Sequence, residues 1–269
     1  MDFGNILILA QKELRDARKN RWFLLYAIAF TGLSLALAWV SLSGAGNYGL
    51  AGFGRTSASL INLILLIVPL MGLTLGALSV AGEREQGSLL YLLAQPINQL
   101  ELLLGKFIGL ALALIAALAL GFGLTALLIA INGGGAQINI YLTLLLLACL
   151  LAVASLSIGF LISATVKRGA TAVGLALFLW LLLVFFGDLG LMGTALVLEL
   201  SVDQLFALAL MNPLQLFKIA AILDLRNNLE VLGPAGIYAY RTYGTQLLPL
   251  LIGLLLIWII IPFALATLL

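Results

Sequence analysis

The side chains that could do chemistry are few and restricted in type. The chain of 269 residues has no histidine and one cysteine, Cys149, and its charged residues are 13 Lys and Arg and 11 Asp and Glu. Without histidine there is no His-ligated zinc or copper site, no Ser-His or Cys-His catalytic pair and no imidazole proton relay. A single cysteine excludes an intramolecular disulfide. We therefore expect no catalytic residue, no metal and no cofactor in this chain.

The positions of the acidic residues and the absence of a phosphate-loop motif limit which enzyme and transporter classes fit this chain. An intramembrane aspartyl protease needs two carboxylates at membrane depth, but Asp188 stands alone and is interpreted as an interfacial residue. Ion-coupled transporters also need ionisable groups inside the membrane, which makes that class a weaker alternative here. The sequence has no GxxxxGK[ST] phosphate loop. If the protein does work against a gradient, a partner must supply the nucleotide site.

The segment of residues 82–106 has the most informative polar pattern. Its first part reads Gly-Glu-Arg-Glu-Gln-Gly-Ser and is followed by a leucine-rich stretch, by Pro96, and then by Glu101 and Lys106. Gly87 can end a helix, Ser88 can cap the next one and Pro96 ends it, which predicts a short, partly apolar helix. Such a helix fits a groove of another protein, and an ordinary loop with an interfacial helix is the alternative.

The segment of residues 82–106 lies between long runs that contain no charged residue. Only 9% of the residues are charged against ~25% in soluble domains, so a soluble protein is excluded, and the net charge of +2 does not indicate nucleic-acid binding. A bilayer crossing takes ~20 apolar residues. The runs predict an all-α integral membrane protein with six transmembrane helices, near residues 22–43, 57–81, 107–131, 138–164, 169–190 and 246–269.

The basic residues predict the orientation. Nine of the 13 Lys and Arg residues fall on the side of both termini and four on the other, so the positive-inside rule places both termini in the cytoplasm. Residues 1–21 form an amphipathic interfacial helix, which is either a plain anchor or a contact for a cytoplasmic partner. Residues 22–190 hold the first five crossings, residues 191–245 form a periplasmic helical segment, and residues 246–269 form the last crossing.

Three further groups of residues have two interpretations each. In the second crossing, Asn62, Pro69 and Thr74 line a conduit or hold helices together. Glycine and serine pairs at four-residue spacing mark packing surfaces, with a dimer seam as one candidate. In the outer segment, capping signals at Ser201 and Asn212 predict two short helices that plug the bundle or dock a partner. The predicted docking residues are Asn212, Pro213, Leu214, Phe217 and Lys218.

The order Glu-x-Glu-x-Gly-Ser, leucine-rich helix, Pro and Glu-x-x-x-Gly-Lys resembles the signature of ABC-2 type permeases, the membrane halves of one class of ATP-binding cassette transporters. The resemblance covers the whole chain. It implies a homodimer in the bacterial inner membrane and a separate cytoplasmic ABC ATPase that binds ATP and Mg. In that family the short helix docks in a cleft of the ATPase. By position, this implies coupling roles for Glu83, Arg84, Glu85, Gly87, Ser88, Leu89, Gln95 and Pro96, with a smaller contact at Lys167 and Arg168.

Within the family, four stretches are most similar to permeases that help to mature the copper centres of nitrous oxide reductase. They are Ser59-Leu60-Ile61-Asn62, Val68-Pro69-Leu70-Met71-Gly72-Leu73, Leu92-Leu93-Ala94-Gln95-Pro96 and Met211-Asn212-Pro213-Leu214-Gln215-Leu216-Phe217-Lys218. This likeness implies a periplasmic partner in addition to the ATPase. Three functions stay open: transport through the dimer interface, conformational work on the periplasmic partner without transport, and export of lipids or drug-like compounds.

Overall fold

The computed structural model describes residues 2–44, 51–88, 97–131, 138–190, 201–226 and 233–269, and every regular element in these ranges is helical. The short π-helix η3 continues α7, and the 3-10 turn η5 precedes α12. The elements are α1 (Phe3–Ala17), α2 (Arg21–Gly44), α3 (Ala51–Glu85), α5 (Gln99–Ile131), α6 (Ile138–Thr165), α7 (Gly169–Phe185), η3 (Phe186–Gly190), α9 (Val202–Leu210), α10 (Pro213–Arg226), α11 (Gly233–Tyr243), η5 (Gly244–Gln246) and α12 (Leu247–Leu268).

The lengths and composition of these helices confirm the prediction of an all-helical membrane protein. In the described part of the chain, five segments are long and apolar enough to cross a membrane, and a sixth is obtained if α9 and α10 count as one broken span. These two helices meet at an angle of 109°. The crossing predicted at 169–190 corresponds to α7 and η3; α7 is shorter, with 17 residues, and packs along α3. The five segments are Arg21–Val40, Ser59–Glu85, Gln99–Ile131, Tyr141–Thr165 and Gly236–Leu268.

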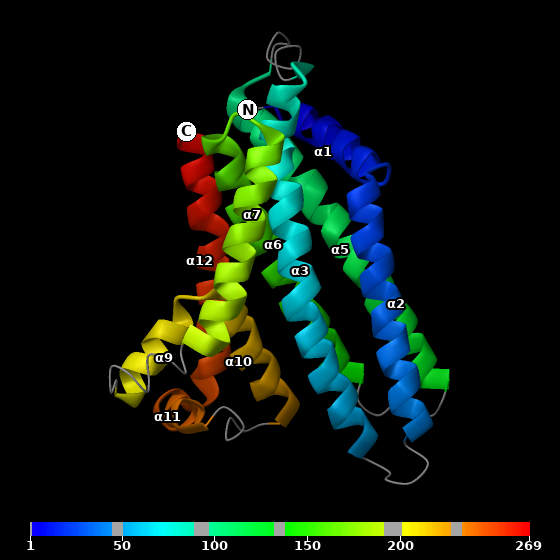
Figure 1. The fold of residues 1–269 in the computed structure, drawn as a ribbon, viewed down its shortest axis with the longest axis vertical. Helices are drawn as coiled ribbons and strands as arrows, with labels where there is room; N and C mark the ends of the chain where they lie inside the picture. Colours follow the sequence, from blue (N-terminus) through cyan, green and yellow to red (C-terminus); the bar gives the residue numbers. More distant parts are fainter. Residues whose placement is uncertain (1, 45–50, 89–96, 132–137, 191–200, 227–232) are drawn as a thin grey trace.

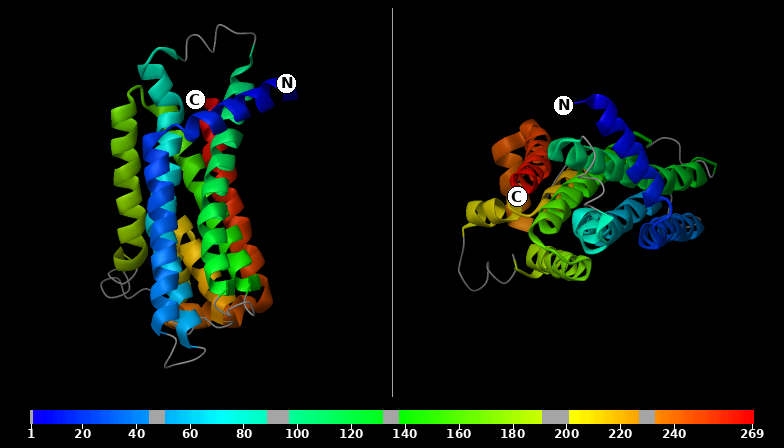
Figure 2. Two further views of the ribbon diagram at one scale, coloured as in Figure 1. Left: turned by 90° about the vertical axis from the view of Figure 1, so that its right-hand side faces the viewer. Right: turned by 90° about the horizontal axis from the view of Figure 1, so that it is seen from above.

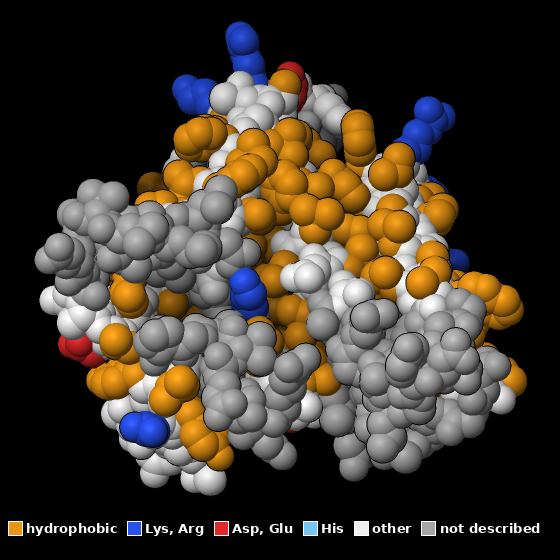
Figure 3. All heavy atoms as spheres, turned by 60° about the horizontal axis from the view of Figure 1, so that its bottom comes forward, with side chains coloured by type: hydrophobic (Ala, Val, Ile, Leu, Met, Phe, Trp, Pro, Cys, Tyr) orange, Lys and Arg blue, Asp and Glu red, His pale blue; other side chains and the backbone are white. Residues whose placement is uncertain are grey.

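The helices form one bundle whose two ends differ. Both termini, α1 and the α6–α7 turn lie at one end, here called the terminus end, and α9, α10 and α11 lie at the opposite end (Figures 1 and 2). The nine basic residues counted in the sequence lie in or just after α1, at the start of α2, near the end of α3, near the start of α5 and in the α6–α7 turn. Figure 3, turned to bring the opposite end forward, shows mostly hydrophobic described side chains and few charges on that face. The assignment of the terminus end to the cytoplasm stays a prediction.

Small residues bring α3 and α6 into close contact. A Cβ atom on Gly76 would lie 2.4 Å from the carbonyl oxygen of Leu156, and one on Gly159 would lie 2.5 Å from the carbonyl oxygen of Leu73. The Ser163 hydroxyl oxygen accepts hydrogen bonds from the backbone of α3. The predicted packing surface therefore lies inside a single chain.

A second close contact places α1 across the start of α5. A Cβ atom on Gly105 would lie 2.5 Å from Cβ of Leu9, and one on Gly109 would lie 2.5 Å from the carbonyl oxygen of Ala10. The amphipathic helix predicted for the first 21 residues thus has a protein face as well as an exposed one. This contact sets the position of the charged groups at the terminus end.

Candidate coupling site

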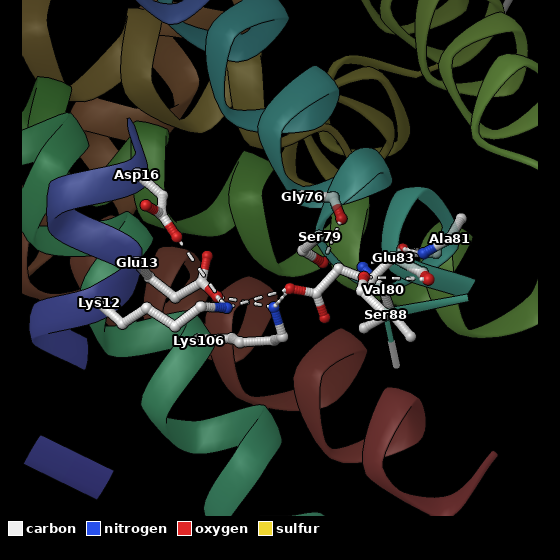
Figure 4. Close-up of polar contacts among 11 residues, drawn as sticks. Lys12, Glu13, Asp16, Gly76, Ser79, Val80, Ala81, Glu83, Ser88 and Lys106 are labelled. Atoms are coloured by element: carbon white, nitrogen blue, oxygen red, sulfur yellow. Dashed lines mark hydrogen bonds and ion pairs between the residues drawn. The ribbon is translucent and has the colours of Figure 1, made fainter. Parts of the chain in front are cut away.

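A buried lysine joins three helices at the terminus end. The Nζ atom of Lys106, near the start of α5, lies 2.7 Å from a carboxylate oxygen of Glu13 on α1 and 2.7 Å from a carboxylate oxygen of Glu83 on α3 (Figure 4). The Lys106 side chain is 1% exposed. A buried cation is tolerated when it is paired and hydrogen-bonded. The three groups, called here the Lys106 cluster, therefore hold the ends of α1, α3 and α5 together.

Lys12 adds a second cation at the edge of the Lys106 cluster. Its Nζ atom lies 3.5 Å from Glu13, 3.4 Å from Glu83 and 4.0 Å from Asp16. Burial lowers the pKa of Lys12, but the nearby carboxylates of Glu13, Glu83 and Asp16 outweigh this effect, so the pKa is raised and the ammonium group stays charged. Two cations thus face the carboxylates of Glu13 and Glu83.

The Glu83 carboxylate is only partly satisfied. One of its oxygens binds both lysines, whereas the other is buried and has no hydrogen-bond partner among the described residues. Glu83 also lines a cavity of about 390 Å³ between α1, α3 and α5. Polar side chains of Glu13, Asp16 and Asn20 lie on the same cavity.

The next two residues of α3 contact the α6–α7 turn. The Arg84 guanidinium donates a hydrogen bond of 3.2 Å to the carbonyl oxygen of Val166, and the Glu85 carboxylate accepts one of 2.8 Å from the backbone N–H of Gly169. Gly169 is the first residue of α7, where a carboxylate satisfies a free N–H group and interacts favourably with the helix dipole. The end of α3 therefore contacts α1, α5 and the α6–α7 turn, including the first residue of α7.

Gly87 separates α3 from the segment that follows. Its φ of +73° lies in the left-handed region, which glycine adopts without the steric cost of a side chain. The Ser88 hydroxyl donates to the carbonyl oxygen of Glu83, 3.3 Å away. Of the predicted coupling residues, Leu89, Gln95 and Pro96 lie outside the described residues.

Glu101 gives α1 another attachment to α5. Its carboxylate accepts hydrogen bonds from the backbone N–H of Asp2 at 2.7 Å and from the side chain of Asn5 at 3.1 Å. Together with the Lys106 cluster, this bond fixes α1 at two separate points along its length. Lys167 and Arg168 are exposed on the α6–α7 turn.

Glu13 was missed as a functional residue, although the sequence held a signal for it. It occupies the same helical stripe as Leu9, Ala10 and Ala17, all of which are buried. A glutamate on an apolar stripe needs a buried cation, and Lys106 in the Gly-Lys pair was the available one. The pairing itself depends on how α1 crosses α5, which spacing does not give.

The predicted conduit residues do not share a surface within one chain. Asn62 is exposed, whereas Pro69 is buried inside α3. Thr74 is 7% exposed and its hydroxyl donates to the carbonyl oxygens of Leu70 and Met71 in its own helix. Trp180 of α7 donates to the carbonyl oxygen of Leu66, three residues before Pro69 in the continuous helix α3. A conduit role stays a prediction for Asn62.

The predicted docking residues lie at the junction of α9 and α10, and most are inside the protein. Leu214 is 4% exposed and Phe217 is 0% exposed, and both belong to the hydrophobic core. The Asn212 side chain caps α10 through the N–H of Leu214 and donates to the carbonyl oxygen of Leu183. Pro213 is buried and Lys218 is half-buried. The burial of Leu214 and Phe217 favours the plug over docking for these two side chains, and partner docking by this segment stays a prediction.

Comparisons with known proteins agree with this architecture. A family model described as ABC-2 family transporter protein matches residues 7–269. A relative from Stutzerimonas stutzeri, named probable ABC transporter permease protein NosY, is 33% identical over 217 residues, which are 78% of this chain and 79% of the relative. A relative of the same name from Pseudomonas aeruginosa is 35% identical over 221 residues, with the same two shares.

Proposed function

This chain belongs to the ABC-2 family of transporter proteins and is the membrane subunit of an ABC transporter, and from this premise we propose that it couples ATP hydrolysis by a separate cytoplasmic ATPase to conformational work across the membrane. The terminus end faces the cytoplasm in this proposal, and the protein acts as a homodimer in the inner membrane. The ATPase binds ATP and Mg.

One observation carries this proposal: the three charged residues at the end of α3 contact α1, α5 and the α6–α7 turn. The stretch from Ser88 to Pro96, which follows within the coupling segment of residues 82–106, is the part that resembles a coupling helix. A displacement of this segment acts on α1 and α5 through Glu83, and on the α6–α7 turn through Arg84 and Glu85. In this proposal the charged motif acts as a joint within the membrane subunit, and other exposed residues at this end, such as Lys167 and Arg168, contact the ATPase.

The packing at the opposite end favours conformational work over a transport conduit. Helix α10 fills the space beside α6 and α12 with buried side chains such as Leu216 and Phe217. Movement of α6 or α12 therefore displaces α10 and the elements next to it. Transport along a dimer interface is the second candidate, and its support is the exposed amide of Asn62 on a membrane-spanning helix, which needs a polar partner there.

The names of the relatives suggest the biological setting. Both are named NosY, so we propose a NosF-like ATPase on the cytoplasmic side, a NosD-like periplasmic partner and a role in maturing the copper centres of nitrous oxide reductase. The copper content of that enzyme in cells lacking this chain tests the setting. An unchanged content would favour export of lipids or drug-like compounds.

The ATPase contact is tested by reversing two exposed charges on the α6–α7 turn. We expect Lys167→Glu with Arg168→Glu to reduce the amount of ATPase that copurifies by about tenfold, because rim charges at an interface steer association and repel when reversed. Arg241→Glu, at the opposite end, is the control and should leave copurification unchanged. Equal recovery of the ATPase with the double variant would contradict a contact at this turn.

A further inference from the structure

Four exposed basic residues lie at the corner between α1 and α2, and among the residues that the structure describes none of their side chains forms a hydrogen bond or ion pair with Glu83, Arg84, Glu85 or the Lys106 cluster. Arg15, Arg18, Lys19 and Arg21 are all exposed, and within the described part of the chain none of them forms an ion pair. They fall within seven consecutive residues. We call these four residues the corner patch.

The acidic residues of α1 do not neutralise the corner patch. Glu13 is buried against Lys106, and Asp16 lies 4.0 Å from Lys12, on the side of the Lys106 cluster. The inner face of α1 therefore holds the paired charges and the outer face holds the unpaired cations. This separation of charge gives the corner an excess positive potential toward its surroundings.

The adjoining aromatic residue fixes the depth of the corner patch. Trp22, which directly follows Arg21, is 63% exposed and lies beside Tyr26 with ring centroids 6.4 Å apart. Exposed tryptophan at the end of a membrane-spanning helix lies at the level of the lipid headgroups. Since Asn20 caps α2 through the N–H groups of Trp22 and Phe23, the helix begins at this level and the basic residues lie just outside it.

We propose that the corner patch binds the phosphate groups of anionic phospholipids, and that lipid bound there supports ATP-driven work by holding α1 in place. Clusters of basic residues next to a membrane span are attracted to anionic headgroups. The bound lipid acts on the joint because α1 is fixed to α5 and α3 through Glu13, Lys106 and Glu83. The second part of the proposal rests on the proposed coupling to an ATPase, whereas lipid binding itself does not.

The test replaces the charges of the corner patch and measures lipid binding directly. The variant is Arg15→Gln with Arg18→Gln, Lys19→Gln and Arg21→Gln, and the matched control keeps the charge with Arg15→Lys, Arg18→Lys and Arg21→Lys. The complex with the ATPase is reconstituted with phosphatidylcholine alone or with added phosphatidylglycerol. Retained phosphatidylglycerol is counted by native mass spectrometry, and ATP hydrolysis is measured in parallel.

We expect the glutamine variant to bind phosphatidylglycerol about tenfold more weakly or worse, and the lysine control to bind it normally, because the attraction depends on charge. Phosphatidylglycerol should raise ATP hydrolysis in the native complex and not in the glutamine variant. Equal retention of phosphatidylglycerol by the glutamine variant, or its loss in the lysine control, would overturn the proposal.

Two further outcomes distinguish a failure of lipid binding from a failure of the proposed coupling to an ATPase. Loss of the ATPase from the glutamine variant with normal lipid retention would identify the corner patch as a protein contact and overturn lipid binding. Absence of the ATPase from the native preparation would refute the proposed coupling, while the count of retained lipid still decides whether the corner patch binds phosphatidylglycerol.

Discussion

Replacing Lys106 by alanine should destabilise the protein by about 3–5 kcal/mol, the cost of breaking a buried ion pair by removing one partner. The substitution leaves the carboxylates of Glu13 and Glu83 facing each other without the cation that lies 2.7 Å from both. Lys12 can replace only part of this interaction, because its side chain is 41% exposed and its Nζ atom lies 3.5 Å from Glu13 and 3.4 Å from Glu83. We expect a lower melting temperature in detergent.

Two companion variants make the Lys106 result specific. Lys167→Ala removes an exposed lysine at the same end and should leave the melting temperature nearly unchanged. The triple variant Lys106→Met, Glu13→Gln and Glu83→Gln removes the three charges together and should recover much of the loss, because no unpaired buried charge remains. A Lys106→Ala protein as stable as Lys167→Ala would refute the structural role of the Lys106 cluster.

Phe217→Ala should also cost about 3–5 kcal/mol, since it leaves a cavity in the core where the side chain is 0% exposed. Helix α10 packs on α6, α12 and α3, so the loss weakens the whole opposite end. Thermal unfolding followed by size-exclusion chromatography measures it, and both the ATPase and any periplasmic partner should be recovered in lower yield together. Met211→Ala, at a side chain that is 70% exposed, is the control.

A stable Phe217→Ala variant that loses a periplasmic partner and keeps the ATPase would show that the ring docks that partner, which is the docking interpretation of the sequence. Such an outcome requires α10 to leave the core, and it would contradict the plug.

The sequence predicted the helical class and the long apolar runs because every backbone group in lipid must be satisfied within its own segment. It also identified the Glu83, Arg84 and Glu85 motif as important. It expected these side chains to contact the ATPase, a role that stays a prediction, but spacing along α3 does not reveal that α5, α1 and the α6–α7 turn also converge on this point. That convergence depends on the approach of α1 to Gly105 and Gly109, a tertiary contact.

The interior residues show the same limit. Asn62 and Thr74 were grouped because both are polar residues of one span, but they occupy different faces of α3, one exposed and one buried. The apolar side chains of Leu214 and Phe217 fitted either a docking site or a core, since both environments favour them. The bend between α9 and α10 decides between these two environments, and it directs α10 into the bundle.

In the proposed function, the end of α3 transmits displacement of the coupling segment to the rest of the bundle. The most direct test is a distance between spin labels at Val40 of α2 and Met211 at the α9–α10 junction, two exposed positions, in a Cys149→Ser protein bound to its ATPase. ATP should change this distance in the otherwise native complex and in the Gln86→Ala control. In Arg84→Ala with Glu85→Ala, which removes both contacts to the α6–α7 turn, the ATPase should still copurify and hydrolyse ATP while the distance change is lost. A distance change of full size in that double variant, or loss of the ATPase from it, would contradict the account.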